Sequence, residues 1–412
     1  MVNNRCVVYC KVLFIICFCV FATVRLQGQI NDRVFKTDYR INHEKTDELR
    51  IEFDNLNFFR NDEFDTDYMN GNSMPGFWAQ FKLTYQPLEI VRLEAGVHLL
   101  HFWGANSYPN FAYRDISTWK GNQFQKGFHA LPFLRAQVKL SDRLNLVFGN
   151  IYGGANHNLI EPMYNPELNL MADPEAGLQL LYHSNPLDVD LWVNWESFIF
   201  NLDTHQESFI FGLSSRLKYN REDAPFHFYT PFQVLVQHRG GEIDTIKINS
   251  VQTFMNGAVG IGGVWNVNHS VLKNINIEVD ATSYYQQAGK LWPFDDGFGM
   301  YAKASADLRD FRVKTSYWQC KDFISILGFP FYGAVSNTEE GMTFKSPKMV
   351  AFGVEYSRNF GKGSSFGVDF DFYKHFSTTA YTPEGAISKK GSTSFSVGAY
   401  LRLNTSFLVK HF

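Results

Sequence analysis

The sequence predicts an all-β protein: a transmembrane, antiparallel, up-and-down β-barrel of about 16 strands. Three observations predict it. Apolar residues recur at every second position in many segments, and the connections between these segments alternate between long and short. Aromatic residues make up 17% of the 412 residues, whereas charged residues make up only 19%. Period-two alternation indicates strands with one apolar and one polar face, and an aromatic-rich apolar face suits contact with lipid.

The N-terminus predicts export. The first eleven residues contain Arg5 and Lys11 and no acid, and residues 12–24 form an apolar run. That run is shorter than the roughly 17 to 25 residues of a spanning helix, so we interpret residues 1–28 as a cleaved signal peptide. Cleavage after Gly28 is preferred and cleavage after Ala22 is a rival.

The mature chain is predicted to hold no intrachain disulfide. Four of the five cysteines lie in the signal segment, which leaves only Cys320. Residues 29–48 are expected to form a periplasmic N-terminal segment, and residues 49–412 are expected to form the barrel. Stability must therefore come from a large hydrogen-bonded architecture.

The strands follow from the alternation. In residues 130–140, for example, Leu134, Ala136 and Val138 share one face while Arg135 and Gln137 share the other. The sixteen predicted strands are roughly 49–59, 76–85, 91–102, 130–140, 144–152, 175–182, 189–200, 208–219, 226–239, 251–265, 275–285, 298–308, 311–320, 348–360, 366–373 and 394–412.

The order of the connections separates a membrane barrel from a soluble sandwich. Odd-numbered connections such as 103–129 and 321–347 are long, whereas even-numbered ones such as 141–143 and 309–310 are short. Short periplasmic turns and long extracellular loops are typical of barrels in the outer membrane of Gram-negative bacteria, whereas loops of a sandwich follow no such order. Outer-membrane lipids are therefore the expected surroundings.

Two stretches carry a resemblance to a known group of proteins. The chain ends on Phe412 after a strand-like segment, which resembles the terminal signature read by the barrel-insertion machinery. The sequence Phe-Asp-Asn-Leu-Asn-Phe-Phe-Arg at 53–60, with the Phe, Tyr and Asn richness elsewhere, resembles porin-like outer-membrane proteins of Bacteroidota. The resemblance implies an envelope protein and supplies no functional residues.

A porin-like channel for passive or selective passage of small hydrophilic solutes is the function predicted first. Sixteen strands enclose a lumen too wide for wall side chains to fill, and residues 29–48 are too few for a plug domain. The alternative is a non-conducting barrel that acts as a surface adhesin or as a subunit of an envelope complex, with a surface or lipoprotein partner. The 38 basic residues do not exceed the 41 acidic ones, which argues against nucleic acid as a partner.

The connection 153–174 is expected to fold inward and narrow this channel. It begins with two glycines and contains three prolines, which favour a bent, stiffened loop. Its acids would face basic residues of the early strands, and opposed rings of charge select ions. The pore-lining candidates are Arg50, Arg92, Arg135, Glu161, Glu167 and Asp173.

No enzyme, cofactor or metal site is predicted. The sequence contains no zinc-binding His-Glu-x-x-His, nucleophile elbow or phosphate-binding loop. His157 is the histidine that most invites a catalytic interpretation, but no serine lies near it in the sequence. The aromatic residues of connections 103–129 and 321–347 are expected to pack together or to cap the lumen.

Overall fold

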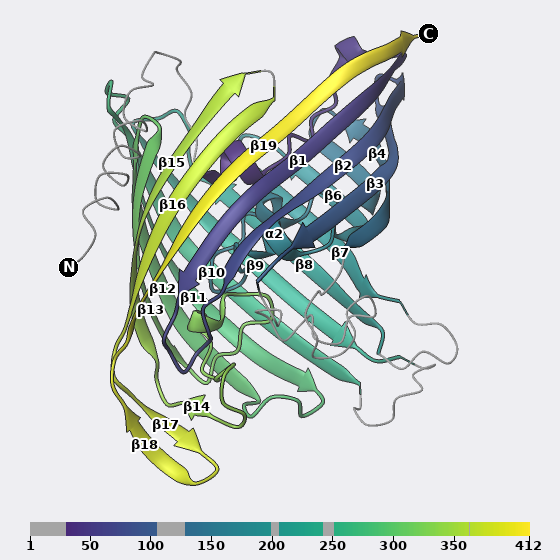
Figure 1. The fold of residues 1–412 in the computed structure, drawn as a ribbon. Coiled ribbons are helices and arrows are strands. Elements are labelled where there is room, and N and C mark those ends of the chain that lie inside the picture. The colour runs from purple at the N-terminus through teal and green to yellow at the C-terminus, as the bar shows by residue number, and fades with distance from the viewer. Residues whose placement is uncertain (1–29, 105–127, 199–205, 242–250, 362) are drawn as a thin grey trace, which may run out of the picture.

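The protein is a closed barrel of sixteen antiparallel strands (Figure 1). The structure is a computed structural model that describes residues 30–104, 128–198, 206–241, 251–361 and 363–412. The predicted fold class is thereby confirmed, while the predicted signal segment lies outside the described residues. The barrel strands are β1 Glu48–Glu63, β2 Ser73–Leu88, β3 Val91–Phe102, β4 His129–Ser141, β5 Leu144–Asn150, β6 Ala176–His183, β7 Leu187–Ser197, β8 Ser208–Lys218, β9 Phe226–Arg239, β10 Gln252–Asn266, β11 Leu272–Ala288, β12 Asp296–Leu308, β13 Phe311–Lys321, β15 Lys348–Gly361, β16 Ser364–His375 and β19 Thr393–His411.

The ring closes where the first strand meets the last. β1 pairs with β19 from Glu48 opposite His411 to Glu63 opposite Phe395. The chain also forms a small sheet of β14 Thr343–Phe344, β17 Thr378–Thr382 and β18 Gly385–Lys389, which lies at the end of the barrel opposite the C-terminus (Figure 1). These three strands fall within connections that the sequence predicts as loops, because they are too short to show an alternation.

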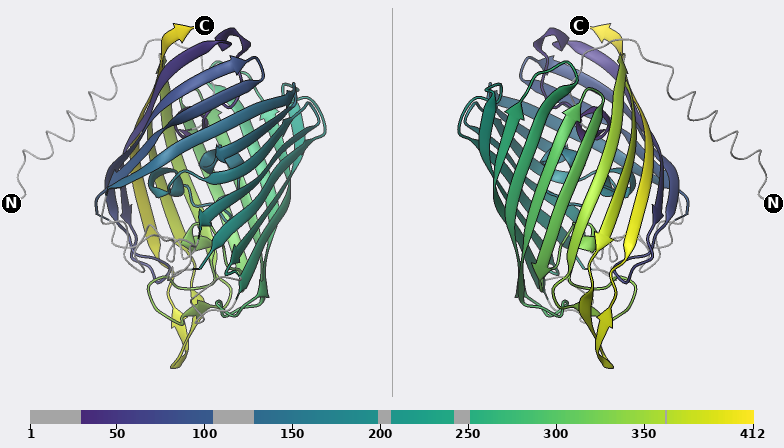
Figure 2. Two further views of the ribbon diagram at one scale, coloured as in Figure 1. Left: turned by 90° about the vertical axis from the view of Figure 1, so that its right-hand side faces the viewer. Right: turned by 90° about the vertical axis from the view of Figure 1, so that its left-hand side faces the viewer.

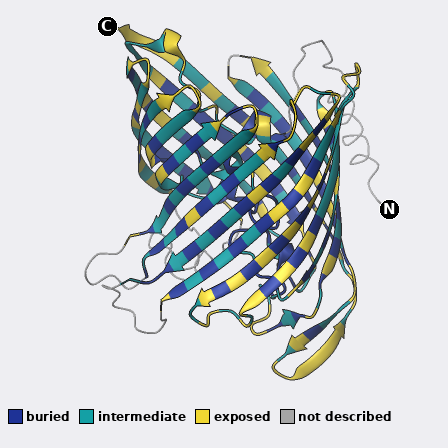
Figure 3. Cartoon of the chain, turned by 180° about the vertical axis from the view of Figure 1, so that it is seen from behind, coloured by how far each residue is buried: buried dark blue, intermediate teal, exposed yellow. Residues whose placement is uncertain are grey.

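The outside of the barrel is apolar, and the protein lies in the outer membrane. Side chains alternate between exposed and buried along the strands, as Figure 3 shows. Apolar side chains exposed on the outside include Phe81, Leu134, Val259, Ile261, Met300 and Phe352. Among the described residues, no helix is long and apolar enough to cross a membrane.

A charge on this outer face should destabilise the barrel. Val259 lies in the middle of β10 and is half exposed to the outside, so Val259→Arg is expected to cost about 2 to 4 kcal/mol if it lies near the bilayer midplane. Val259→Leu keeps the face apolar and is the matched control. Urea unfolding in lipid vesicles measures both variants, and equal stabilities would contradict the assignment of this face to lipid.

The lumen is occupied by inward-folded segments, which Figure 2 shows inside the barrel. The first follows β5 and contains η4 Gly154–His157 and α2 Leu168–Met171, and the second follows β13 and contains η5 Pro330–Tyr332. Their apolar residues belong to one buried cluster with wall residues of many strands. As expected, the aromatic residues Phe323, Phe329 and Phe331 of the second segment are buried. Side chains therefore fill much of the space that strand count alone would leave to water.

The N-terminal segment also enters the lumen. One guanidinium nitrogen of Arg402, on β19, donates to the backbone carbonyls of Val34, Phe35 and Lys36 at 2.7, 3.0 and 2.8 Å. Ile30 packs over Gly367 of β16, where a Cβ would lie 2.5 Å from its Cδ1. The described beginning of the segment 29–48, with η1 Asn31–Phe35, thus lies inside the wall, while η2 His43–Lys45 precedes β1.

Candidate functional site

The barrel wall is interrupted between β4 and β7. β5 has 7 residues and β6 has 8, whereas β4 has 13 and β7 has 11. Pairing of β4 with β5 stops at Arg135 opposite Gly149, and pairing of β6 with β7 stops at Gly177 opposite Asn194. Within the described residues, the part of β4 from residue 129 to 133 therefore has no strand on that side.

The residues at this break suit a free edge. Asn150 accepts a hydrogen bond from the backbone N–H of Leu134 through its side-chain oxygen, at 2.8 Å. Asn194 does the same for Ala176 at 2.9 Å. Pro132 lies two residues before Leu134, so its backbone nitrogen points toward the same open side of β4. Proline has no N–H there to leave unpaired. The sequence thus provides for the missing strand partners.

Gly149 turns the chain away from β4 and into the barrel. Its φ is +82°, a conformation that side chains rarely adopt, and a Cβ there would lie 2.2 Å from the carbonyl oxygen of Leu134. The segment that follows enters the lumen and returns at Glu175. The break in the wall and the inward segment therefore have one local cause.

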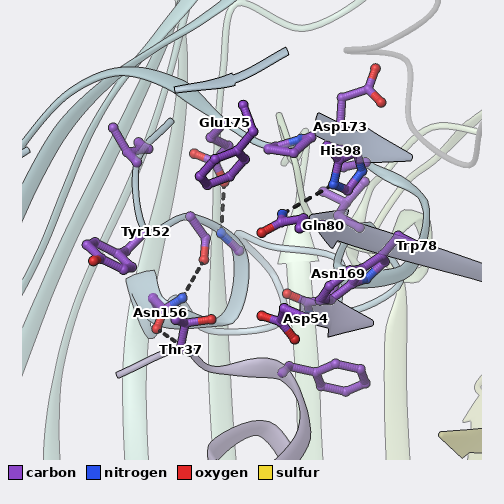
Figure 4. A pocket seen from close by; sticks show the side chains of 18 of the residues that line it. Thr37, Asp54, Trp78, Gln80, His98, Tyr152, Asn156, Asn169, Asp173 and Glu175 are labelled. Atoms are coloured by element: carbon purple, nitrogen blue, oxygen red, sulfur yellow. Dashed lines mark hydrogen bonds between the residues drawn. The ribbon is translucent and has the colours of Figure 1, made fainter. Parts of the chain in front are cut away.

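A pocket of about 120 Å³ lies behind the break, shown in Figure 4. The barrel register aligns Asp54 of β1, Gln80 of β2 and His98 of β3 in one row across its wall. The inward segment contributes Asn169 and Asp173 from the other side. The pocket is thus formed jointly by the wall next to the break and by the segment that Gly149 directs inward.

His98 presents one ring nitrogen to this pocket. The side chain is 3% exposed, and its Nδ1 lies 3.2 Å from the amide nitrogen of Gln80. With the amide donating, Nδ1 accepts and the proton of the neutral ring sits on Nε2. Nε2 is buried without a hydrogen-bond partner among the described residues. A buried N–H of this kind is an oriented donor for a ligand oxygen.

His129 and Asp173 form a hydrogen-bonded pair beside the pocket. Nδ1 of His129, the first residue of β4, lies 3.0 Å from Oδ1 of Asp173. Both side chains are largely buried, at 11% and 20% exposure. A carboxylate that accepts the Nδ1 proton fixes the ring and leaves Nε2 as the basic nitrogen. Both residues also lie within electrostatic range of His98.

Asp54 serves a structural role at the bottom of the pocket. Its two oxygens accept hydrogen bonds from Arg402 at 2.9 and 2.7 Å. Trp78 closes another side by donating from its indole nitrogen to the carbonyl of Asn169 at 3.1 Å. No cluster of three or more His, Cys, Asp or Glu suited to a metal ion occurs in the described ranges.

His157 lies in the inward segment and has a different environment. Its ring is 3.6 Å from that of Trp192 and stacks on it, and Asp190 and Glu175 lie 2.7 and 3.0 Å from its two nitrogens. Burial alone would lower the pKa of His157, but the two carboxylates outweigh it and raise the pKa to about 10. The doubly bound imidazolium holds the segment to β7 and does not act as a base.

Replacing His157 should have an effect on stability that depends on pH. Its pKa is higher in the folded state than the roughly 6.5 of an unfolded chain, so its contribution is fully present below about pH 6.5 and is lost as the pH rises toward 10. We expect the loss in unfolding free energy of His157→Gln to be largest at pH 6 and to shrink by pH 10. Urea unfolding at both pH values measures it, and a loss independent of pH would contradict the charged state.

The predicted pore residues are dispersed among other partners. Arg50 pairs with Glu48 at 2.7 Å, Arg92 pairs with Glu52 at 3.1 Å, and Arg135 lies 3.5 Å from Glu94. The described contacts of Glu161, Glu167 and Asp173 include none of these three arginines.

The acids instead bind other groups of the lumen. Glu161 accepts a hydrogen bond from the hydroxyl of Tyr332 at 2.6 Å, and Glu167 pairs with Arg60 at 2.9 Å. The connection does fold inward, as predicted, but it packs against the wall and does not form opposed rings of charge. Of the six predicted residues, Arg135 and Asp173 line the pocket behind the break.

Sequence reasoning selected Arg135 and Asp173, which line the pocket, but it missed His98, which also lines it, and His129, which pairs with Asp173. His98 lies at a lumen-facing position of a predicted strand, which was the available signal. The partnership of His129 with Asp173 spans 44 residues and depends on the short β5–β6 hairpin, and no local pattern of residues reveals it.

One family profile covers nearly the whole barrel. The family described as Lipid A 3'-O-deacylase-type matches residues 41–412. No protein of curated function matches the chain. The family match contradicts our expectation that the chain is not an enzyme, because the family is one of enzymes. Of the predicted resemblance, the coarser statement holds, namely that the chain is an outer-membrane barrel.

Several solved outer-membrane structures are similar to the chain. OprD of Pseudomonas aeruginosa is 9% identical with a TM-score of 0.47, over 91% of this chain and 99% of that one. OccAB4 of Acinetobacter baumannii is 13% identical with a TM-score of 0.46, over 89% and 100%. OmpT of Vibrio cholerae is 10% identical with a TM-score of 0.44, over 86% and 99%. Likenesses this distant say nothing about what the chain does.

Proposed function

We propose that this protein is an acyl-ester hydrolase, because the chain belongs to the Lipid A 3'-O-deacylase-type family. The substrate is an acylated lipid of the outer leaflet of the lipid A type, and water is the second reactant. The observation that carries the assignment to a site is the pocket behind the break, where His129 is oriented by Asp173 and His98 presents an unpaired Nε2.

These three residues account for ester hydrolysis with atoms and protons balanced. Nε2 of His129 takes a proton from water as the water oxygen bonds to the ester carbonyl carbon. Asp173 stabilises the imidazolium that forms. Nε2–H of His98 donates to the carbonyl oxygen, which becomes negatively charged. The carbon–oxygen bond to the alcohol then breaks, and His129 returns the proton to the alcohol oxygen, giving a fatty acid and a free hydroxyl.

Water is the proposed nucleophile because of the side chains that line the pocket. The described lining contains neither serine nor cysteine. Cys320 lies elsewhere and is buried, packed near the carbonyl of Tyr332. A direct attack by water therefore requires the fewest groups.

The test is release of fatty acid from a defined lipid. Purified full-length protein in vesicles that contain lipid A should release one acyl chain, and mass spectrometry of the remaining lipid should show the loss at the 3' position. Phospholipid vesicles without lipid A are the control for general esterase activity. Intact lipid A after prolonged incubation would contradict the proposal.

A narrow channel is the second candidate. A further cavity of about 390 Å³ lies in the lumen, lined by charged residues that include Arg60, Lys314, Asp369 and Asp371. A cavity of this kind would carry ions if it opened at both ends of the barrel. Planar-bilayer recording separates the candidates: discrete conductance steps support a channel, whereas the hydrolase proposal expects an electrically silent barrel because the inward segments pack against the wall.

A further inference from the structure

We propose that the break between β4 and β7 is a lateral entrance through which one fatty acyl chain of an outer-leaflet lipid reaches the pocket. This inference rests on the proposed function for the fate of the lipid, but entry of the chain can be measured without catalysis. The proposed entrance is supported by the height of the break in the membrane, by its width, by the side chains at its edges, and by the positions of His98 and His129.

The break lies in the half of the wall that faces the outer leaflet. β5 starts at the short turn after β4, which is the periplasmic end of the barrel. Its 7 residues rise by roughly 18 Å at about 3.4 Å per residue and a tilt of about 40°. The apolar band of such a barrel is about 25 Å tall, so the hairpin ends within the band and the opening above it meets hydrocarbon.

The backbones of the two edge strands are far enough apart to admit a hydrocarbon chain. β4 and β7 are separated by the two short strands, so their axes lie about 14 Å apart at roughly 4.8 Å per strand. Above the ends of β5 and β6, the described chain turns inward at Ile151 and returns at Glu175. Figure 2 (left) shows the short helices of this segment inside the wall on that side.

The edges are built to face lipid. An unpaired backbone group exposed to hydrocarbon costs several kcal/mol, so open sheet edges are avoided there unless they line a cavity. The side chains of Asn150 and Asn194 cover backbone N–H groups at the two edges, and Pro132 removes another donor. Outward apolar residues, Leu134, Phe148 and Leu178, surround the lower rim. These outward side chains are apolar and suit contact with an acyl chain.

The strand that forms one edge also carries the proposed base. β4 runs from the extracellular end at His129 to the periplasmic end at Ser141, so His129 lies above Pro132. In a lipid of the outer leaflet the ester lies above its acyl chain, nearer the head group. A chain that enters between the edges beside Pro132 and Phe133 therefore brings its ester to the level of His129.

Photo-crosslinking tests entry independently of hydrolysis. Full-length protein is reconstituted in vesicles with a lipid that carries a diazirine in one acyl chain, and the adducts are mapped by mass spectrometry. We expect adducts on the lining residues Phe133, Ile151 and Pro174 in addition to the outer face. Adducts confined to outward residues, in equal yield at Leu134 and at Met300 on the far wall, would overturn the proposal.

A blocking experiment connects the entrance with activity. Ala130 is an exposed residue of the free edge. In the protein without the predicted signal peptide, Ala130→Cys can be coupled to a bulky maleimide, because Cys320 is then the single native cysteine and is 1% exposed. Coupling should lower lipid hydrolysis more than tenfold and leave hydrolysis of a short water-soluble ester within twofold. Coupled Met300→Cys should retain both activities.

The two proposals fail in different ways. Unchanged lipid hydrolysis by the coupled Ala130→Cys variant would overturn the entrance while the hydrolase stands. If the unmodified protein hydrolyses neither ester, the hydrolase fails, and the adducts on Phe133, Ile151 and Pro174 still decide whether acyl chains enter.

Discussion

His129→Gln is expected to lower kcat for deacylation by about 100- to 10,000-fold, the usual contribution of a general base. Glutamine keeps a polar side chain beside Asp173 but cannot take a proton from water. The measurement is the rate of fatty-acid release from vesicles of lipid A. His101→Gln is the control, because His101 lies near the same end of the wall on the outward face of β3, and it should retain the wild-type rate.

The stability of the variant separates chemistry from structure. His129 begins β4 and pairs with Asp173 of the inward segment. Glutamine at this position can still donate a hydrogen bond to Asp173, so the urea midpoint of His129→Gln should stay close to that of the wild type. An unchanged deacylation rate in a folded His129→Gln protein would contradict the assignment of the base.

Arg402→Met is expected to cost about 3 to 5 kcal/mol of unfolding free energy, because it leaves the carboxylate of Asp54 buried and unpaired. Both side chains of this pair are 5% exposed. The variant also loses the hydrogen bonds to three successive carbonyls of the N-terminal segment. Urea unfolding gives the stability, and trypsin cleavage after Arg33 reports release of the segment.

Two further variants sharpen this prediction. Asp54→Asn combined with Arg402→Met removes the uncompensated charge and should recover part of the loss. Arg221→Met breaks an ion pair with Asp223 that is mostly exposed, and such pairs contribute about 0 to 1 kcal/mol. A loss in Arg402→Met no larger than that of Arg221→Met would contradict the role of Arg402.

The wall of the barrel was predictable because the sequence of each strand shows which of its faces is apolar and which is polar. A strand in contact with lipid on one face shows period two within ten residues, and the loop order adds the topology. The period-two pattern of β4 correctly placed Gln137 on the inner face of the barrel, but it led us to expect that this side chain faces water. Gln137 is fully buried and bonds to the carbonyl of Tyr39 and the side chain of Asn145, because the inner space is filled by segments whose sequences have no regular period.

The site was predictable only in part for the same reason. The sequence singled out Asp173 and the inward course of its connection, but it assigned the acid to arginines of the early strands. Opposite charge is a weak guide inside a barrel with many charges of both signs. Arg92 of the same strand and Arg135 of the neighbouring strand both bind Glu94, which leaves Asp173 to His129. Which partner an acid takes depends on strand register and on strand length.

The position of Arg402 has a consequence for how the protein is assembled. Asp54 lies on the first strand and Arg402 on the last, so their pair crosses the seam that closes the ring. The N-terminal segment binds the same guanidinium, and it can be held only once the end of the chain has been made and has met the beginning. Closing the seam and anchoring the N-terminal segment therefore depend on the same guanidinium, and a barrel whose first and last strands have not met lacks that anchor.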